Sequence, residues 1–212
     1  MNYTNYFTND ERLAYKMDVG SVCTRNLFLP WVNGTVLEVG PGMNRICKDS
    51  YSIDIKDGVS IEDTGLSSGF DVIIMSHVLE HVKSDLKAIR ECERLLKPGG
   101  RLVVVSPANK SMICTDKEVA NNGHIRRYNR NRVQWLESEN FPCIYFRYVH
   151  GLHNLVWNRL KYVLKAINYP MRKLDGKSIY ARKWYAWIQP GLIRVLNKYD
   201  RGGNAFFVME KQ

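Results

Sequence analysis

The feature that most constrains the fold of this chain is a pair of apolar runs, 70–75 and 101–105, separated by a segment of helical periodicity at 84–96. Continuous apolar runs of five or six residues are typical of strands buried on both faces. When a helix joins two such strands, the strands pair in parallel, because the helix returns the chain to the same end of the sheet. The sequence therefore predicts an α/β fold with a Rossmann-like, mostly parallel sheet sandwiched by helices.

Shorter segments extend this pattern along the chain. The sequence predicts strands at 35–39, 51–55, 144–149 and 204–210, a further candidate strand at 59–61, and helices at 10–29, 129–139 and 152–167. Only 16 residues separate Glu38 from Asp54, and another 16 separate Asp54 from Phe70. We therefore expect the helices that flank the second strand to be shortened or absent.

A chain of 212 residues with 45% apolar content is long enough for one well-buried core. Its 15 glycines and 7 prolines exclude collagen-like and low-complexity classes. We expect a single domain, 1–212, with three parts. These are an N-terminal helix, 1–34, a cofactor-binding core, 35–140, and a basic, aromatic helical C-terminal elaboration on the substrate side, 141–212.

Targeting signals are not evident in the sequence. No run approaches 18 uncharged apolar residues, and the first 16 residues have neither the basic nor the apolar region of a secretory signal. Five scattered cysteines without a CxxC pair fit free thiols in a reducing compartment. We therefore expect a cytoplasmic protein, with contact at the membrane periphery as a further option.

Positive charge is concentrated in the last third of the chain. Residues 1–140 carry 18 Lys/Arg and 18 Asp/Glu, whereas residues 141–212 carry 13 against 3 and hold 14 of the 24 aromatic residues. Such an excess favours an anionic partner. The candidates are a small or glycan- or lipid-linked acceptor, an anionic membrane surface, and, as second choice, nucleic acid.

A glycine turn and an acidic residue mark the ends of the first two predicted strands. At Gly40 and Gly42 the missing Cβ lets a ligand approach the backbone, and a carboxylate at Asp54 can accept both hydroxyls of a ribose. The dinucleotide fingerprint requires a third glycine where Arg45 stands, and no GxxxxGK[ST] phosphate loop occurs. The pattern favours a nucleoside ligand without a pyrophosphate.

Four separate segments, in order, resemble the class I S-adenosylmethionine-dependent methyltransferases. They are VLEVGPG at 36–42, SIDI at 52–55, FDVIIMSHVLEHV at 70–82 and RLLKPGGRLVVVSP at 94–107. The resemblance covers about residues 35–140 and implies S-adenosylmethionine as the cofactor and methyl transfer as the reaction. One departure is Asn44, which stands where the family usually has a small residue.

The resemblance also implies which residues surround each part of the cofactor. They are Glu38, Gly40 and Gly42 at the methionine, Asp54 at the ribose, Ile55, Asp63 and Thr64 at the adenine, and Ser76 at the methyl group.

The implied reaction transfers a methyl group to an O or N atom of an acceptor. The sulfonium is already an activated donor, so the protein mainly aligns the acceptor, and a base is needed only if the acceptor loses a proton. His77 is our first candidate for that base because it follows the apolar run, and His124 is the second. The alternative is that His77 is a polar residue at the start of a helix and has no role in the reaction. We interpret Glu80 and His81 as structural.

Residues 123–136 resemble the segment that closes over the acceptor site in the same family. Arg126, Arg127 and Tyr128 are the candidate substrate contacts, since arginine binds phosphate or carboxylate through two N–H groups. The alternative is a solvated turn whose tyrosine packs in the core.

The residues from His77 to His81 also match HxxEH, a zinc-binding pattern of peptidases. The two histidines share a face only inside a helix, and His77 directly follows a predicted strand. A peptidase would also leave the glycine turn and Asp54 unexplained. We therefore expect no metal site.

Two alternatives to small-molecule methylation remain. A nucleic-acid methyltransferase that acts on base nitrogens normally has the motif [DN]PP[YFW] after the strand predicted here at 70–75. In this chain the corresponding residues, 76–79, are Ser-His-Val-Leu. A non-catalytic binding module of the same fold is suggested by Asn44 and by the shortened helices.

Overall fold

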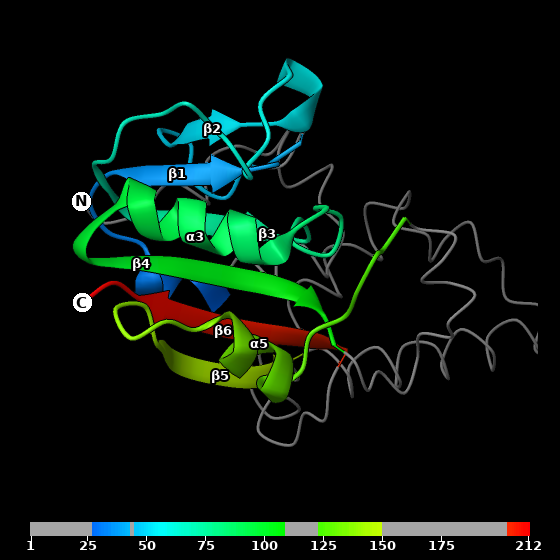
Figure 1. The fold of residues 1–212 in the computed structure, drawn as a ribbon. Coiled ribbons are helices and arrows are strands. Elements are labelled where there is room, and N and C mark those ends of the chain that lie inside the picture. The colour runs from blue at the N-terminus through cyan, green and yellow to red at the C-terminus, as the bar shows by residue number, and fades with distance from the viewer. Residues whose placement is uncertain (1–26, 43–44, 109–122, 150–202) are drawn as a thin grey trace, which may run out of the picture.

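A six-stranded sheet forms the centre of the structure, a computed structural model that describes residues 27–42, 45–108, 123–149 and 203–212 (Figure 1). Its strands are β1 (Val36–Val39), β2 (Tyr51–Ile53), β3 (Phe70–Ser76), β4 (Leu96–Pro107), β5 (Cys143–Val149) and β6 (Asn204–Glu210). They lie in the order β2-β1-β3-β4-β6-β5. The described helices are η2 (Leu29–Trp31), η3 (Ile55–Asp57), α3 (Asp85–Leu95) and α5 (Arg130–Leu136).

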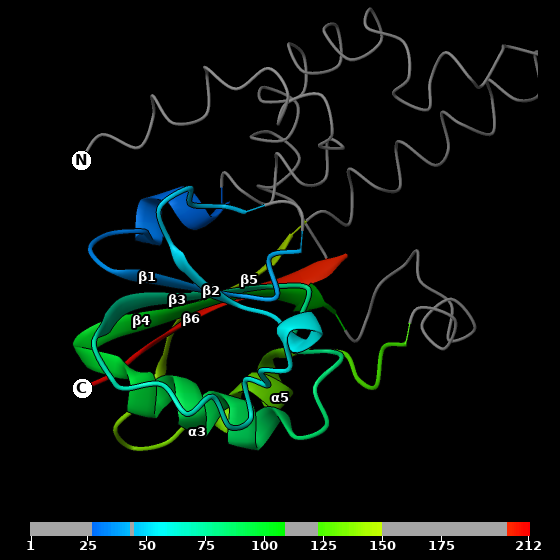
Figure 2. The same ribbon diagram turned by 90° about the horizontal axis from the view of Figure 1, so that it is seen from above.

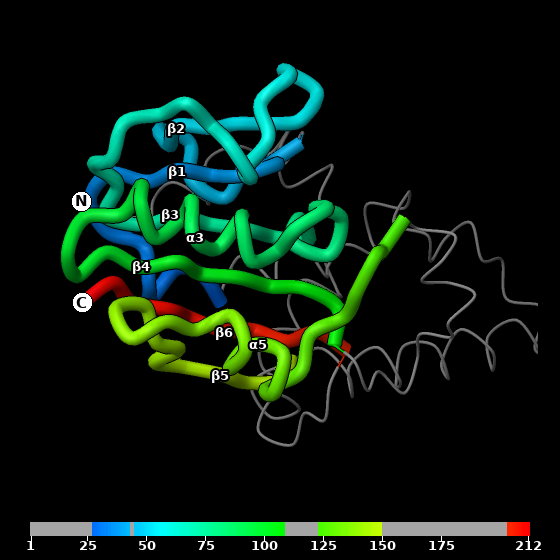
Figure 3. The backbone as a smooth tube through the Cα atoms, in the orientation of Figure 1, coloured from blue at the N-terminus to red at the C-terminus, as the bar shows by residue number. Residues whose placement is uncertain are grey.

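Strand directions confirm the mostly parallel sheet. β2, β1, β3 and β4 pair in parallel, whereas β6 is antiparallel to both β4 and β5. The end of the chain returns between β4 and β5, as the tube in Figure 3 shows. The sheet therefore contains strands from 35–140 and from 141–212.

Both faces of the sheet are buried, which explains the continuous apolar runs. In β3, Ile73 and Met75 belong to the core on one face, and Val72 and Ile74 to the core on the other. Helices α3 and α5 cover the first face, and the η2 segment, which follows Phe28, lies against the second (Figure 2).

The sequence of α3 explains both its position and its start. The side chain of Ser84 caps the helix by accepting a hydrogen bond from the backbone N–H of Lys87 (3.3 Å). Four small or apolar side chains on one face are buried: Ala88, Ile89, Cys92 and Leu95. The helix predicted at 84–96 is thus confirmed to within a residue at each end.

Two expectations about strands change. The segment 59–61 forms only an isolated bridge between Ser60 and Asp63. The strand predicted at 101–105 extends over 96–107, because the glycine turn is paired with the end of the chain. Gly99 donates its N–H to the carbonyl of Lys211 (2.7 Å), and Lys211 donates to that of Gly100 (2.9 Å).

The shortened helices are confirmed within the described residues, since η3 is the one helix between Arg45 and Gly69. The predicted helix at 152–167 and most of that at 10–29 lie outside the described residues. Among those described, no helix is long and apolar enough to cross a membrane.

Candidate functional site

The predicted site residues gather at one edge of the sheet, where the parallel strands end. Gly40 follows β1, Asp54 follows β2, and His77 follows β3. The chain leaves β1 toward β2 on one side and reaches β3 on the other. In open α/β sheets, ligands bind outside the carboxyl ends of the strands at such a switch in strand order.

The turn after β1 requires glycine for two reasons. Gly40 and Gly42 have φ angles of 60° and 55°, in the left-handed region that glycine tolerates. Gly40 also donates its N–H to the carbonyl of Ile53 at the end of β2 (2.8 Å). A Cβ at Gly40 would lie 2.8 Å from Cγ2 of Val78, whereas one at Gly42 would meet none of the described atoms within 4 Å.

These two glycines should respond differently to substitution. Gly42→Ala is expected to cost about 1 kcal/mol for its backbone conformation alone, and Gly40→Ala about 2–4 kcal/mol, because the contact with Val78 adds an overpacking penalty. Urea unfolding of both variants measures the difference. Adding Val78→Ala to the Gly40→Ala variant should recover part of the loss, and equal costs for the two glycines would contradict this geometry.

The structure corrects the role expected of Glu38, which is buried (2% exposed) and engaged within the protein. Its carboxylate accepts hydrogen bonds from the backbone N–H groups of Ile46 (2.7 Å) and Cys47 (2.6 Å) and from the hydroxyl of Ser50 (2.6 Å). All are intramolecular bonds to the segment between β1 and β2. Glu38 therefore positions that segment, and its carboxylate is not available to a ligand.

Asp54 and Ile55 remain available at the end of β2. One oxygen of Asp54, Oδ1, accepts a hydrogen bond from the N–H of Lys56 (3.1 Å) and caps η3. Among the described residues, no hydrogen bond involves the other oxygen, Oδ2. Ile55 follows with 70% of its side chain exposed, which is unusual for an isoleucine at a strand end.

Asp63 and Thr64 differ in availability. Asp63 is exposed, whereas Thr64 donates both its N–H (3.3 Å) and its hydroxyl (2.6 Å) to Oε1 of Glu91 on α3. The guanidinium of Arg94 hydrogen-bonds the same carboxylate, and together with Thr64 it lowers the pKa of Glu91 to about 2, against the effect of burial. Thr64 thus anchors its loop to α3, and the exposed Asp63 remains the candidate contact on that loop.

The anchoring by Glu91 predicts a pH dependence of stability. A carboxyl group whose pKa is lowered in the folded protein stabilises it above the unfolded pKa, and this contribution is lost as the pH falls from about 4.5 to about 2. Glu91→Gln is expected to cost about 1 kcal/mol at pH 7, and the deficit should vanish near pH 2. Urea unfolding across this range, with the exposed Glu139→Gln as control, measures it. A deficit independent of pH would contradict it.

His77 has an orienting partner that the sequence did not indicate. Its Nδ1 lies 3.2 Å from Oε1 of Glu80, which is fully buried and whose Oε2 accepts the hydroxyl hydrogen bond of Ser106 (2.9 Å). Burial works to raise the pKa of Glu80, but the hydrogen bond and charge of His77, with the bond from Ser106, outweigh it and lower the pKa. Glu80 is therefore a carboxylate that accepts from Nδ1–H of His77, and in the neutral imidazole this leaves Nε2 as the acceptor.

The backbone of His77 is also distinctive. Among the described residues it is the one non-glycine with positive φ (57°), a conformation that costs about 1 kcal/mol and often marks functional sites. Its N–H donates to the carbonyl of Val105 on β4 (2.8 Å), and 43% of its side chain is exposed. Ser76, directly before it, is half-buried at the end of β3.

The structure corrects the substrate role expected of Tyr128. This residue is fully buried and donates its hydroxyl to the carbonyl of Leu79 (3.0 Å), beside the carboxylate of Asp85 (3.2 Å). Burial, with the negative charge of Asp85, raises the pKa of the hydroxyl. The alternative in which the tyrosine packs in the core is the one observed.

Arg126 is likewise engaged within the protein. It donates to the carbonyls of Val82 (2.6 Å) and Lys83 (2.8 Å), and its Nε lies 3.8 Å from Asp85. Arg126 therefore closes the turn before α3 and is not a free anion ligand. Arg127 is half-buried and remains a candidate contact.

His124 lies beside the His77–Glu80 pair. Burial lowers the pKa of His124, which keeps the imidazole neutral, and the nearby Glu80 opposes this shift only in part. Its ring packs edge to face on that of His81, with centroids 4.8 Å apart. The second candidate base thus lies near the first, at the same edge of the sheet.

The residues present fit S-adenosylmethionine. Within the described part of the chain, Asp54 has one carboxylate oxygen without a hydrogen bond, as a ribose would need, and Ile55 has an exposed apolar side chain, as an adenine would need. The open space beside Gly42 allows a ligand to approach the backbone. The fit rests on these three neighbouring residues.

Comparison with known proteins agrees with this arrangement. A family described as "Methyltransferase domain" matches residues 23–104. Over 61 residues the chain is 36% identical to ubiquinone biosynthesis O-methyltransferases from strains of Xanthomonas oryzae pv. oryzae. The matched segment is 29% of this chain and 24% of those relatives, so the similarity spans about a quarter of their length.

Solved structures share the fold at low sequence identity. A phosphoethanolamine N-methyltransferase 2 from Haemonchus contortus, solved with S-adenosyl-L-methionine, gives a TM-score of 0.59 at 13% identity, covering 91% of this chain and 52% of that one. The MccD protein gives 0.56 at 14% identity, covering 91% and 98%. The [4+2]-cyclase SpnF gives 0.55 at 17% identity, covering 89% and 80%. The fold is thus shared with a cyclase as well, and does not by itself fix the reaction.

Proposed function

We propose that this chain, which resembles the class I S-adenosylmethionine-dependent methyltransferases and matches their domain over residues 23–104, transfers a methyl group to a hydroxyl oxygen of a small acceptor. One observation carries the proposal: at the sheet edge that presents Asp54, the buried carboxylate of Glu80 orients the exposed imidazole of His77.

Binding of the cofactor is assigned to the ends of β1 and β2. Asp54 accepts the ribose hydroxyls, Ile55 packs on the adenine, and Asp63 lies at the edge of the base. Gly40 and Gly42 let the methionine portion approach the backbone, and Ser76 borders the reacting methyl group. When bound, S-adenosylmethionine supplies that methyl group already activated on a sulfonium sulfur.

His77 is assigned the acid–base chemistry. Because Nδ1–H donates to Glu80, Nε2 is the atom that accepts a proton from the acceptor hydroxyl. The charge of Glu80 then stabilises the imidazolium. An amine acceptor that is already neutral needs no such base, so the oriented pair favours oxygen over nitrogen within the O- or N-methylation that the sequence allows.

The acceptor is proposed to be small and anionic. Its charge is inferred from the excess of Lys and Arg in 141–212, most of which lies outside the described residues, and Arg127 remains the candidate contact within them. A link of the acceptor to a glycan or lipid, and contact with a membrane surface, rest on the same charge. Nucleic acid stays the second choice.

A methyl-transfer assay tests this proposal. The protein is incubated with methyl-labelled S-adenosylmethionine and a panel of phenols, hydroxy acids and sugar phosphates, each beside a matching amine. We expect label in a hydroxyl acceptor, and His77→Asn to lower turnover by about 100-fold or more while cofactor binding stays unchanged. A preference for amines, with His77→Asn fully active, would refute the role of the pair. Failure to bind S-adenosylmethionine would instead favour the non-catalytic module.

A further inference from the structure

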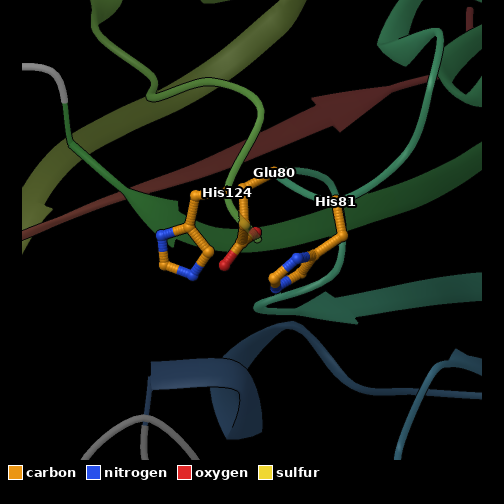
Figure 4. A group of neighbouring side chains, drawn as sticks. All are labelled: Glu80, His81 and His124. Atoms are coloured by element: carbon orange, nitrogen blue, oxygen red, sulfur yellow. The ribbon is translucent and has the colours of Figure 1, made fainter. Parts of the chain in front are cut away.

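We propose that Glu80, His81 and His124 bind a divalent transition-metal cation. Each offers one ligand atom, and these atoms all lie within 4.8 Å of one another. The three residues come from two segments, the turn after β3 and the loop before α5. In Figure 4 the carboxylate of Glu80 lies between the two imidazole rings.

The ligand types indicate the class of ion. Two imidazoles and one carboxylate form the ligand set of catalytic zinc sites and of non-haem iron(II) sites, whereas Mg²⁺ and Ca²⁺ prefer oxygen ligands alone. Within first-row divalent ions, nitrogen ligands favour those late in the series, such as Co²⁺ and Zn²⁺. The proposed occupant is therefore an ion of this kind.

Neighbouring groups already hold the ligands in the form that a metal needs. Nδ1 of His81 lies 3.1 Å from the carbonyl oxygen of Gly123, which accepts only, so Nδ1 carries the proton and Nε2 presents a lone pair. The carboxylate of Glu80 is also held in place, because its Oε2 accepts a hydrogen bond from the hydroxyl of Ser106. Metal-binding histidines and carboxylates commonly have such partners.

His124 supplies an independent observation. Its Nδ1 is shielded from solvent and has no hydrogen-bond partner among the described residues, which is costly for a buried polar atom. In Figure 4 the other ring nitrogen, Nε2, faces the carboxylate of Glu80, so Nε2 is the atom that His124 offers to the ion.

The proposed site differs from the peptidase pattern HxxEH. His77 is bound to Glu80 and is not a ligand, and residues 77–84 form a turn and not a helix. The second histidine of the site comes instead from position 124, which no local pattern connects to Glu80. The metal therefore does not imply peptidase activity.

The position of the site suggests its use. Three protein ligands leave coordination positions open, and His81 is exposed, so the ion is accessible from solvent. An oxygen of the acceptor bound there would lie beside His77. This last step rests on the proposed function, whereas the metal site itself does not.

Metal titration tests the site without cofactor or acceptor. The full-length protein is treated with chelator, then titrated with Co²⁺ while its visible absorption is recorded, and with Zn²⁺ by calorimetry. We expect one ion per chain, and His81→Ala and His124→Ala each to weaken binding by at least about 100-fold, since even loss of an orienting partner costs about 10–100-fold.

The chain offers a matched control, because two further histidines, His150 and His153, lie outside the described residues. The double variant His150→Ala/His153→Ala removes as many imidazoles as His81→Ala/His124→Ala and should bind the ion like the unaltered protein. His81 is exposed, so its single substitution keeps the fold, which circular dichroism verifies. Absence of stoichiometric binding, or equal loss in both double variants, would overturn the proposal.

Discussion

Replacing Asp54 by alanine is expected to weaken binding of S-adenosylmethionine by about 100-fold. The carboxylate at the end of β2 is assigned both ribose hydroxyls, and each hydrogen bond to a charged group contributes about 1.5–3 kcal/mol. Two bonds at the lower end of this range correspond to about 100-fold in the dissociation constant. Calorimetric titration with S-adenosylmethionine, and separately with S-adenosylhomocysteine, measures the effect.

Two further variants separate ribose binding from local structure. Asp54→Asn keeps an acceptor for the N–H of Lys56 and so preserves the cap of η3, but removes the charge and should still bind poorly. Asp57→Ala removes an exposed acid three residues later and should bind normally. Equal affinities of the Asp54→Ala variant and the unaltered protein would contradict the assignment of the ribose to this strand end.

Asp85→Ala is expected to destabilise the fold by about 3 kcal/mol. The buried carboxylate of Asp85 (3% exposed) accepts bidentate hydrogen bonds from the guanidinium of Arg132 on α5 (2.8–3.0 Å) and lies beside the hydroxyl of Tyr128. It therefore joins the start of α3 to α5. Removing this buried carboxylate leaves the buried hydroxyl of Tyr128 and the guanidinium of Arg132, which is 35% exposed, without their partner, and this is more costly than losing a surface pair.

Urea unfolding measures this loss, and a surface pair provides the control. Lys97 and Asp71 form an ion pair whose lysine is 45% exposed, and Lys97→Met is expected to cost less than about 1 kcal/mol. Replacing Arg132 by methionine in the Asp85→Ala background should recover part of the stability, because it removes the uncompensated cation. A cost for Asp85→Ala no larger than that for Lys97→Met would refute the structural role of this cluster.

The elements that the sequence predicted well are those whose signal is local. The strand at 204–210 and the helix at 84–96 follow from the apolar pattern within one segment. The position of Asp54 at the end of β2 follows from the same kind of local pattern, whereas its role at the ribose stays a prediction. In each case the neighbouring residues in the chain carry the information.

The features that sequence reasoning missed depend on contacts between distant segments. Glu80 was interpreted as structural, yet its partners include Ser106 on β4, and no local pattern links the two. Tyr128 was a candidate substrate contact because its segment resembles the one that closes over the acceptor site, with packing in the core as the alternative. Its actual partner, Asp85, lies 43 residues earlier. Buried polar partners of this kind are visible only once the fold brings the segments together.

The positions of the candidate site residues bear on how the excess of Lys and Arg in residues 141–212 is interpreted. The residues assigned to the cofactor all lie within residues 1–140, which carry equal numbers of basic and acidic side chains. Arg126, a candidate anion ligand in this range, is engaged by backbone carbonyls and Asp85. That the excess positive charge of 141–212 serves the acceptor or a surface, and not the cofactor, stays a prediction.

The central claim is that the carboxyl ends of β1, β2 and β3 bind a nucleoside cofactor next to His77. A crystal structure of the protein with S-adenosylhomocysteine tests it most directly. We predict the ribose hydroxyls within hydrogen-bonding distance of the Asp54 carboxylate, the adenine on Ile55, and the sulfur facing Ser76 and His77. A nucleoside bound elsewhere, or bound with its ribose away from Asp54, would contradict the account.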